Sequence, residues 1–339
     1  MSEDFVERGH RWIVRQTRPV TETDSTLSAD VRAPLVGRAR SRRDIARVIV
    51  FIQAALLGIV GLLYVAGHAE PYVDALSLIG AGILFWGAQR MGTDAPIYIS
   101  GRGDEAGQRR VPWDWTDFLM FWPGAFIAAS LLVSIAVPIA DAATNGVDPT
   151  VRTAAESFVQ QAAFYGGALF NIYVLVGLRR GGTLYHVGWR RFSWWWIPVA
   201  VVAAVATLEI ADVLQALSQH LFPGAHNTQC QAVQHDYSHF LVLAVIVVCV
   251  IAPLSEETIF RGFVYGWLHR VMPAGFAVLV SGAIFASLHG VVLLLIPLWA
   301  VGIILAVVFQ SSRSLWPGAL THALFNLPGI IAILSSPTC

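Results

Sequence analysis

Long runs of apolar residues, separated by short polar connections, fill the chain from residue 48 onward. A helix that crosses a bilayer needs ~20 predominantly apolar residues. On that criterion the pattern predicts spans at about 48–66, 73–89, 118–140, 157–178, 194–216, 239–268, 275–289, 298–311 and 315–335. The predicted fold is therefore all-α, a polytopic transmembrane helical bundle of about 8–9 spans, because the run 239–268 can be one kinked helix or two pieces.

The composition supports a membrane protein. Only 13% of the 339 residues are charged and 56% are hydrophobic, with a mean hydropathy of +0.62. A soluble domain carries roughly a quarter charged residues. The formal net charge is zero, and nothing in the sequence indicates a nucleic-acid partner. We expect no cleavable signal peptide, because no apolar segment of that kind precedes the first run.

The distribution of arginine predicts how the chain threads the membrane. All 22 basic residues are arginines, and they cluster at 38–47, 90–117 and 179–193. The connections 67–72 and 217–238 contain none. Positively charged loops stay on the cytoplasmic side, so this alternation predicts a cytoplasmic N-terminus and a C-terminus on the outside.

Three regions are expected along the chain. Residues 1–44 are polar and charged, and we expect a cytoplasmic tail that is disordered or loosely structured. Residues 45–237 form an N-terminal transmembrane region of about five spans, and residues 238–335 contain the polar motifs described next. At the outer end of the fifth span, Glu209 and Asp212 could line a substrate entrance, but an interfacial position is expected. The three cysteines are widely spaced and indicate no disulfide framework.

Charged residues interrupt the sixth apolar run. Two adjacent carboxylates, Glu256 and Glu257, are followed by Arg261. Charge at bilayer depth is costly, so its default interpretation is functional, with a partner nearby. Glu257 and Arg261 lie four residues apart and can pair on one helical face, whereas Glu256 points elsewhere and can face a cavity. Pro253 lacks a backbone donor and predicts a kink just before these residues.

Two further polar pairs lie in the last third of the chain. Phe285 with His289, and His322 with Asn326, each stand at i and i+4 on one helical face. At 1.5 Å per residue from the cytoplasmic ends of their helices, Glu256 and His289 lie ~21 and ~22 Å deep. His322 and Asn326 lie ~13 and ~20 Å deep by the same count. The pattern therefore predicts one active site inside the membrane.

The residue types suggest a hydrolytic chemistry. A glutamate in an apolar pocket suits a general base that takes a proton from water as the water attacks a carbonyl. Histidine and asparagine N–H groups can stabilise the oxyanion that develops. No serine or cysteine has a convincing base beside it. Zinc held by Glu256, His289 and His322 is the rival interpretation, although no HExxH motif is present.

Three motifs carry a resemblance to a known family: Glu256-Glu257-x-x-x-Arg261, Phe285-x-x-x-His289 and His322-x-x-x-Asn326. In this order and spacing they resemble the CAAX-protease and bacteriocin-processing (CPBP, or Abi) family of intramembrane proteases, and within it the CAAX prenyl protease type 2. The resemblance covers about residues 238–335. It implies an all-helical intramembrane endopeptidase of a bacterial plasma membrane, acting on membrane-embedded or lipid-modified peptides.

The resemblance also implies a role for each residue. Glu256 would activate water, and His289 would help to hold that water. His322 and Asn326 would stabilise the oxyanion. Glu257 and Arg261, with Phe285, would support the site. Both metal-dependent and metal-free mechanisms are described for the family, so the resemblance leaves the cofactor open, with zinc as one possibility.

Two other classes of protein remain as alternatives. A non-proteolytic membrane adaptor or immunity protein could keep the same fold for binding. A transporter could use Glu256 and Glu257 as a proton relay, but no internal repeat of the kind common in carriers is visible. The complete motifs favour the enzyme.

Overall fold

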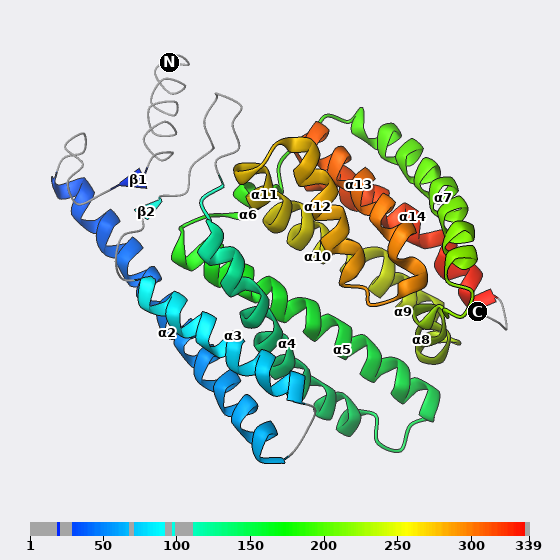
Figure 1. Ribbon diagram of the computed structural model, residues 1–339, viewed down its shortest axis with the longest axis horizontal. Helices are drawn as coiled ribbons and strands as arrows, with labels where there is room; N and C mark the ends of the chain where they lie inside the picture. The colour runs from blue at the N-terminus through cyan, green and yellow to red at the C-terminus, as the bar shows by residue number, and fades with distance from the viewer. Residues whose placement is uncertain (1–18, 21–28, 68–70, 92–96, 99–110, 336–339) are drawn as a thin grey trace, which may run out of the picture. The chain divides into compact units, whose positions relative to one another are not determined.

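The computed structural model of the protein describes residues 19–20, 29–67, 71–91, 97–98 and 111–335. By their internal contacts the residues form two compact units, which are described separately below. The first unit comprises Met1–Ser130 and Gly167–Val187, and the second comprises Leu131–Gly166 and Gly188–Cys339. The elements are drawn in Figure 1.

Helices dominate both units. The first unit contains β1 (Pro19–Val20), α2 (Ala29–Gly67), α3 (Pro71–Arg90), β2 (Ile97–Tyr98), η1 (Tyr173–Arg179) and α6 (Leu184–Val187). Two helices contribute residues to both units, namely α4 (Trp115–Ala143) and α5 (Pro149–Ile172). The second unit contains α7 (Trp196–Leu221), α8 (Thr228–Tyr237), α9 (Leu241–Val245), η2 (Ile246–Ile251), α10 (Ala252–Glu256), η3 (Glu257–Tyr265), α11 (Gly266–Val271), α12 (Ala274–Ser287), η4 (Val292–Leu294), α13 (Leu295–Ser312) and α14 (Leu315–Ser335).

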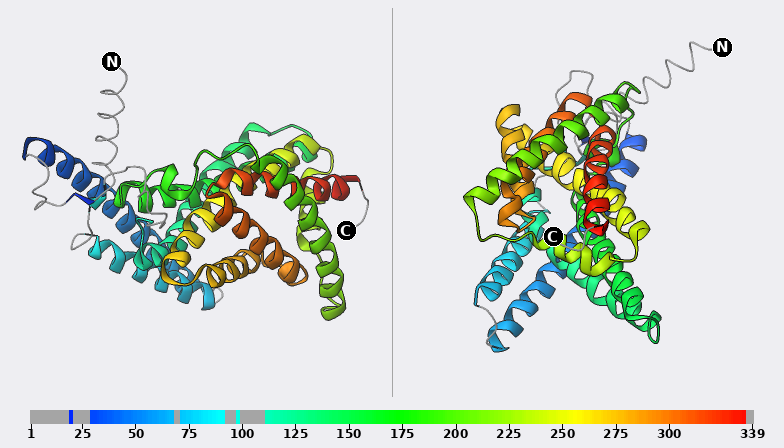
Figure 2. Two further views of the ribbon diagram at one scale, coloured as in Figure 1. Left: turned by 90° about the horizontal axis from the view of Figure 1, so that it is seen from above. Right: turned by 90° about the vertical axis from the view of Figure 1, so that its right-hand side faces the viewer.

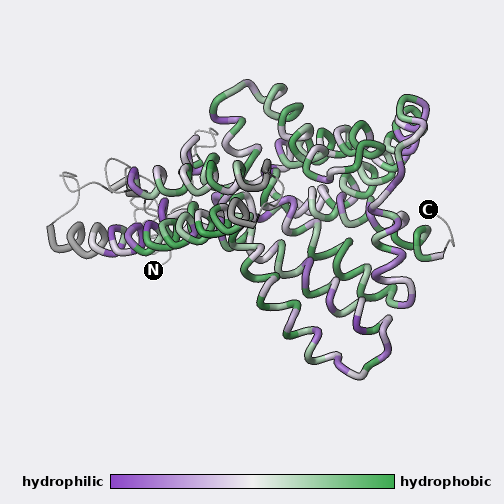
Figure 3. Tube along the Cα trace, turned by 60° about the horizontal axis from the view of Figure 1, so that its bottom comes forward, coloured by the Kyte–Doolittle hydropathy of each residue, from purple (hydrophilic) through white to green (hydrophobic). Residues whose placement is uncertain are grey.

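The predicted helical membrane fold is confirmed. Seven helical segments within the described residues are long and apolar enough to cross a membrane. They are Gly37–Leu63, Trp115–Ala143, Pro149–Arg179, Trp196–Leu221, Leu241–Val271, Val292–Ser312 and Leu315–Ser335. Figure 3 shows that most of the helical trace is hydrophobic. The protein is therefore an integral membrane protein.

Several predicted boundaries differ from the structure. Helix α2 begins at Ala29, so part of the predicted tail is helical, while residues 1–18 and 21–28 lie outside the described residues. Helix α12 has 14 residues and is shorter than a full span. The connection 217–238 contains the short helix α8, whose first turn is capped where the side chain of Asn227 accepts a hydrogen bond from a backbone N–H.

In the first unit, α2 and α3 lie side by side, as Figures 1 and 2 show. This unit also holds a buried cluster of charges, which we call the ion cluster: Asp114, Thr116, Asp117, Arg179 and Arg180. Arg179 Nη1 lies 2.5 Å from Asp117 Oδ1, and Arg180 Nη2 lies 2.6 Å from Asp114 Oδ2 and 2.7 Å from Asp117 Oδ2. Two cations thus face two carboxylates, and the charges balance.

Asp114 lies at the edge of the ion cluster and is partly exposed. Its Oδ1 accepts hydrogen bonds from both the backbone N–H and the hydroxyl of Thr116, at 2.9 and 2.6 Å. Burial alone raises the pKa of Asp114. The charge of Arg180 and the hydrogen bonds from Thr116 outweigh burial and lower the pKa of Asp114 to about 2.

The second unit is built around the continuous helical segment Leu241–Val271. Its hydrogen-bond register changes along its length, because η2 and η3 are π-helical and α10 between them is α-helical. The sequence predicted a kink at Pro253. The structure shows that the segment is helical on both sides of Pro253, which directly follows the π-helical turns of η2.

Two glycines bring α12 and α13 into close contact. A Cβ atom placed on Gly302 would lie 2.7 Å from the Cα of Gly282. Glycine at both positions therefore permits a backbone approach that a side chain would block. Helix α7 packs against both α13 and α14 in the same unit. This arrangement gathers the helices that carry the predicted site residues.

Candidate active site

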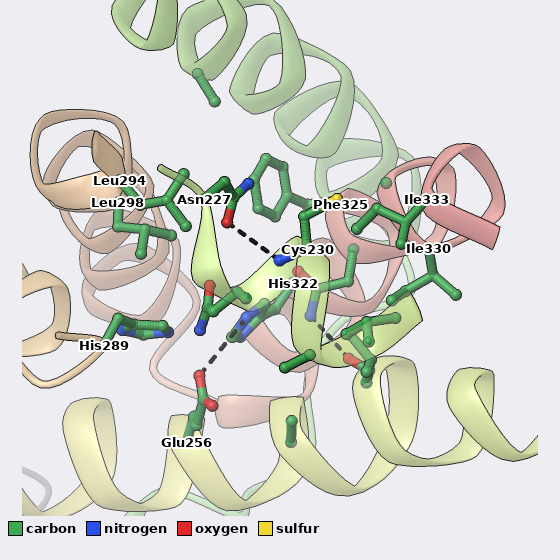
Figure 4. Close-up of a pocket in the computed structure, with 18 of the residues that line it drawn as sticks. Asn227, Cys230, Glu256, His289, Leu294, Leu298, His322, Phe325, Ile330 and Ile333 are labelled. Carbon is green, nitrogen blue, oxygen red and sulfur yellow. Dashed lines mark hydrogen bonds and ion pairs between the residues drawn. The ribbon is translucent and has the colours of Figure 1, made fainter. Parts of the chain in front are cut away.

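A cavity of about 590 Å³ in the second unit receives the predicted site residues. Its lining includes Glu256, Phe285, His289, His322 and Asn326, from three different helical segments or their ends. Figure 4 shows the side chains of Glu256, His289 and His322 directed toward one another. The structure thus brings together residues that the sequence placed at comparable depth.

Glu256 presents its carboxylate to this cavity. Only 8% of the residue is exposed, and His322 is 4% exposed. His322 Nε2 lies 3.8 Å from Glu256 Oε2, and His322 Nδ1 lies 3.4 Å from Glu257 Oε1. The imidazole of His322 therefore stands between the two adjacent carboxylates.

Glu257 and Arg261 lie behind the cavity and do not line it. Both are fully buried, and Arg261 Nη1 lies 3.0 Å from Glu257 Oε1, as their spacing predicted. Arg261 Nη2 also donates to the carbonyl of Gly302 at 3.3 Å. A Cβ atom on Gly318 would lie 2.7 Å from Glu257 Oε2, so glycine there lets helix α14 approach the carboxylate.

The ring of Phe285 contacts both the buried Arg261 and the two histidines of the site. The guanidinium carbon of Arg261 lies 4.5 Å from the centre of this ring, which is a cation–π distance. The rings of His289 and His322 approach Phe285 with centroids at 4.7 and 5.9 Å. Phe260 packs edge-on at 5.1 Å. Phe285 therefore fixes the orientation of both imidazoles by packing.

His289 follows the end of helix α12 and is held by the backbone. Its Nδ1 lies 2.7 Å from the carbonyl oxygen of Phe285, four residues earlier. A carbonyl only accepts hydrogen bonds, so Nδ1 carries the proton in this contact. In the neutral imidazole Nε2 then keeps a lone pair that can accept a hydrogen bond.

Tyr165 is a cavity residue that the sequence motifs did not identify. It lies on helix α5, and its hydroxyl donates to Glu256 Oε1 at 2.6 Å. A donor on a carboxylate makes a strong, charge-assisted hydrogen bond. Gln161, one helical turn away, also lines the cavity. The signal was present in the sequence, because Gln161 and Tyr165 form a polar i, i+4 pair within the apolar run 157–178.

Asn326 is held by a backbone carbonyl. Its Nδ2 donates to Val248 O at 2.7 Å. The predicted role as an oxyanion donor requires the second amide N–H, because one is already occupied. Asn326 shares its face of α14 with His322, so the two residues reach the helical segment 241–271 at different levels.

Other predicted features take different places. Asp212, which was expected at the membrane interface, lines the cavity. Cys230 also lines the cavity and is disulfide-bonded, which the cysteine spacing did not indicate, while Cys249 is free. Cys339 lies outside the described residues.

The candidate zinc ligands Glu256, His289 and His322 do not form a three-ligand group among the described residues. Across the part of the chain that the structure describes, no three His, Cys, Asp or Glu side chains come together as a metal-binding group. Catalytic zinc takes three protein ligands, and of the candidate set His322 Nε2 and Glu256 Oε2 lie 3.8 Å apart.

The fold and the site define a class of protein: a helical membrane protein with a buried glutamate and two histidines around an internal cavity. Within this class, residues 238–328 match the family model described as type II CAAX prenyl endopeptidase Rce1-like. The match covers all three motifs, and it confirms the resemblance found in the sequence.

The chain is also similar to "Putative membrane peptidase YdiL" of Bacillus subtilis (strain 168). The two are 28% identical over 135 residues, which is 38% of this chain and 55% of that protein. The similarity thus spans about half the length of the relative. No solved structure matches the chain.

Proposed function

We propose that the protein is an intramembrane endopeptidase in which Glu256 activates a water molecule. The observation that carries this proposal is the setting of the Glu256 carboxylate. It faces a cavity, accepts a hydrogen bond from Tyr165, and has a histidine rather than an arginine as its nearest basic neighbour. A carboxylate with a free lone pair in a partly apolar cavity is suited to act as a general base.

In the proposed reaction, water lies between Glu256 and His289. Glu256 Oε1 is engaged by Tyr165, which leaves Oε2 to accept a proton from the water. His289 Nε2 can accept the second hydrogen bond from the same water, because Nδ1 is fixed on the Phe285 carbonyl. Both acceptors orient the water lone pair toward a peptide carbonyl.

The remaining side chains stabilise the charge that develops. His322 and the free N–H of Asn326 are the proposed donors to the oxyanion, since both line the cavity. Glu256 then delivers the proton to the leaving amine. The buried pair of Glu257 and Arg261 positions these groups through Phe285 and His322 without contacting the substrate.

The substrate class follows from the family match and the location of the site. We infer that the substrate is a membrane-embedded or lipid-modified peptide or protein, with residues 238–335 as the catalytic core. The N-terminus is proposed to be cytoplasmic, in a bacterial plasma membrane, on the basis of the arginine distribution.

Membrane proteomics tests this function for any substrate that resides in the membrane. Cells that produce the wild type are compared with cells that produce Glu256→Gln at equal levels. The expected result is that one or more membrane peptides accumulate uncleaved in the variant. If no cleavage product depends on Glu256 while the protein still binds a membrane partner, the adaptor function replaces the enzyme.

A further inference from the structure

The helical hydrogen-bond pattern is interrupted next to the candidate active site, at the carbonyl of Val248. In an α-helix this carbonyl would accept from the N–H of Ala252, and in a π-helix from the N–H of residue 253. The N–H of Ala252 is directed instead to Val247 O, which is the π-helical bond. Residue 253 is proline and has no N–H. Neither of the usual intrahelical donors is therefore available to Val248.

The side chain of Asn326 occupies the place of the missing donor. Its Nδ2 lies 2.7 Å from Val248 O, which is a short distance for an N–H···O hydrogen bond. Only the NH₂ end of the amide can donate to a carbonyl, so the contact defines how the amide is turned. A carbonyl without a partner costs free energy comparable to a lost hydrogen bond.

This contact also sets how two helical segments face each other. Val248, Ala252 and Glu256 follow one another at intervals of four residues along one segment, and all line the cavity. His322 and Asn326 have the same spacing on α14. Glu256 with His322 and Val248 with Asn326 are contacts that join the segments, and the second runs from side chain to backbone.

We propose that the Asn326 amide replaces the backbone N–H that Pro253 lacks, and thereby positions Glu256 against His322. Asn326 thus has a positioning role that passes through the main chain of the Glu256 helix, in addition to the direct contact proposed for its second N–H. The stability part of this proposal stands on the hydrogen-bond geometry alone. The part that concerns reaction rate rests on the proposed peptidase function.

A double-mutant cycle between Asn326 and Pro253 tests the proposal. The variants are Asn326→Ala, Pro253→Ala and the double variant, each purified in the same detergent as the wild type. Pro253→Ala restores a backbone N–H at the missing position. We expect Asn326→Ala to lower the apparent Tm by roughly 3–8 °C in the wild-type background. In the Pro253→Ala background we expect less than half of that decrease.

The same variants are then assayed with a fluorogenic farnesylated peptide in liposomes. We expect the double variant to recover at least about tenfold in kcat/KM over Asn326→Ala. An amide that acted only on the reacting oxygen could not be replaced by a backbone N–H at residue 253. Recovery of kcat/KM therefore separates a positioning role from a direct one.

Pro297→Ala provides the matched control. Pro297 is also buried, but it lies in the first turn of α13, where a backbone N–H has no intrahelical acceptor. This substitution should not reduce the effect of Asn326→Ala. An equal effect of Asn326→Ala on Tm in both proline backgrounds overturns the proposal, and so does an unchanged Tm in the single variant.

The two readouts fail separately. Recovery of Tm without recovery of kcat/KM contradicts the positioning role. If the wild type does not cleave this peptide, the proteomic comparison decides the proposed function, and the Tm cycle still decides whether Asn326 compensates for Pro253.

Discussion

The two units of the protein each bury a cluster of charged residues, and the clusters differ in the ratio of arginines to carboxylates. The ion cluster of the first unit sets two arginines against two aspartates, and each guanidinium contacts a carboxylate at 2.5–2.8 Å. The second unit sets two glutamates against a single arginine. Arg261 pairs with Glu257, and Glu256 is left to a tyrosine and a histidine.

This difference separates a structural cluster from one that can react. A carboxylate already paired with guanidinium groups has its lone pairs occupied and is a poor base. Among the described residues Glu256 has no such guanidinium partner, and it lies on the cavity, so it can exchange a proton with water. The adjacent motif glutamates therefore differ in their surroundings, because only one of them is paired with an arginine.

The largest expected effects come from removing a buried cation. Arg261→Ala should destabilise the fold by about 3–5 kcal/mol, because it strands the buried carboxylate of Glu257. Arg179→Ala should cost less, because Asp117 keeps its contacts with Arg180. Folded yield and thermal unfolding in detergent measure this, with the exposed Arg191→Ala as the control. A fully stable but inactive Arg261→Ala would contradict the positioning role and indicate direct contact with the substrate.

The histidines should affect rate rather than fold. His289→Ala and His322→Ala are each expected to lower kcat/KM by about 10²–10³-fold, which corresponds to about 3–4 kcal/mol of lost transition-state stabilisation. The assay is cleavage of a farnesylated peptide, and the exposed His220→Ala is the control. Wild-type activity in either cavity variant would remove that histidine from the proposed mechanism.

Tyr165→Phe tests the hydrogen bond that Glu256 accepts in place of an arginine partner. Loss of one hydrogen bond to a charged group costs about 1.5–3 kcal/mol, so kcat/KM should fall by about 10–100-fold with the fold intact. Tyr173→Phe, which removes the same hydroxyl from an exposed position, should have no effect. Equal activity of the two variants would show that Tyr165 does not orient Glu256.

The smallest expected effect concerns the ion cluster at acid pH. The pKa of Asp114 is lowered from 3.8 to about 2. A depressed pKa contributes stability that is present above pH 3.8 and lost as the pH falls toward 2. The apparent Tm should therefore decrease less steeply over this window in Asp114→Asn than in the wild type. Identical slopes would mean that Asp114 titrates alike in the folded and unfolded chains.

The spans could be read from the sequence because each is a long apolar run. The last one, predicted at 315–335, coincides with α14 at Leu315–Ser335. Helix α8 was missed because it is short and polar. The π-helical turns around Pro253 were missed because they depend on hydrogen bonds that no local pattern records.

The convergence of the motif residues on one cavity could be predicted from their depth, because helices have a fixed rise per residue. The partners of those residues could not. Tyr165 comes from a helix far away in the sequence, and the acceptor for Asn326 is a backbone carbonyl, which every residue has. Neither contact can be recognised from a sequence motif, although each one holds a side chain of the site in place.

Cleavage by purified protein tests the central claim, that Glu256 activates water, most directly. Wild type and Glu256→Gln are reconstituted in liposomes with a fluorogenic farnesylated peptide, with and without a strong chelator. We predict cleavage by the wild type with and without chelator, and no cleavage by a folded Glu256→Gln. Cleavage by Glu256→Gln at the wild-type rate, or a wild-type activity that chelation abolishes and zinc restores, would contradict the claim.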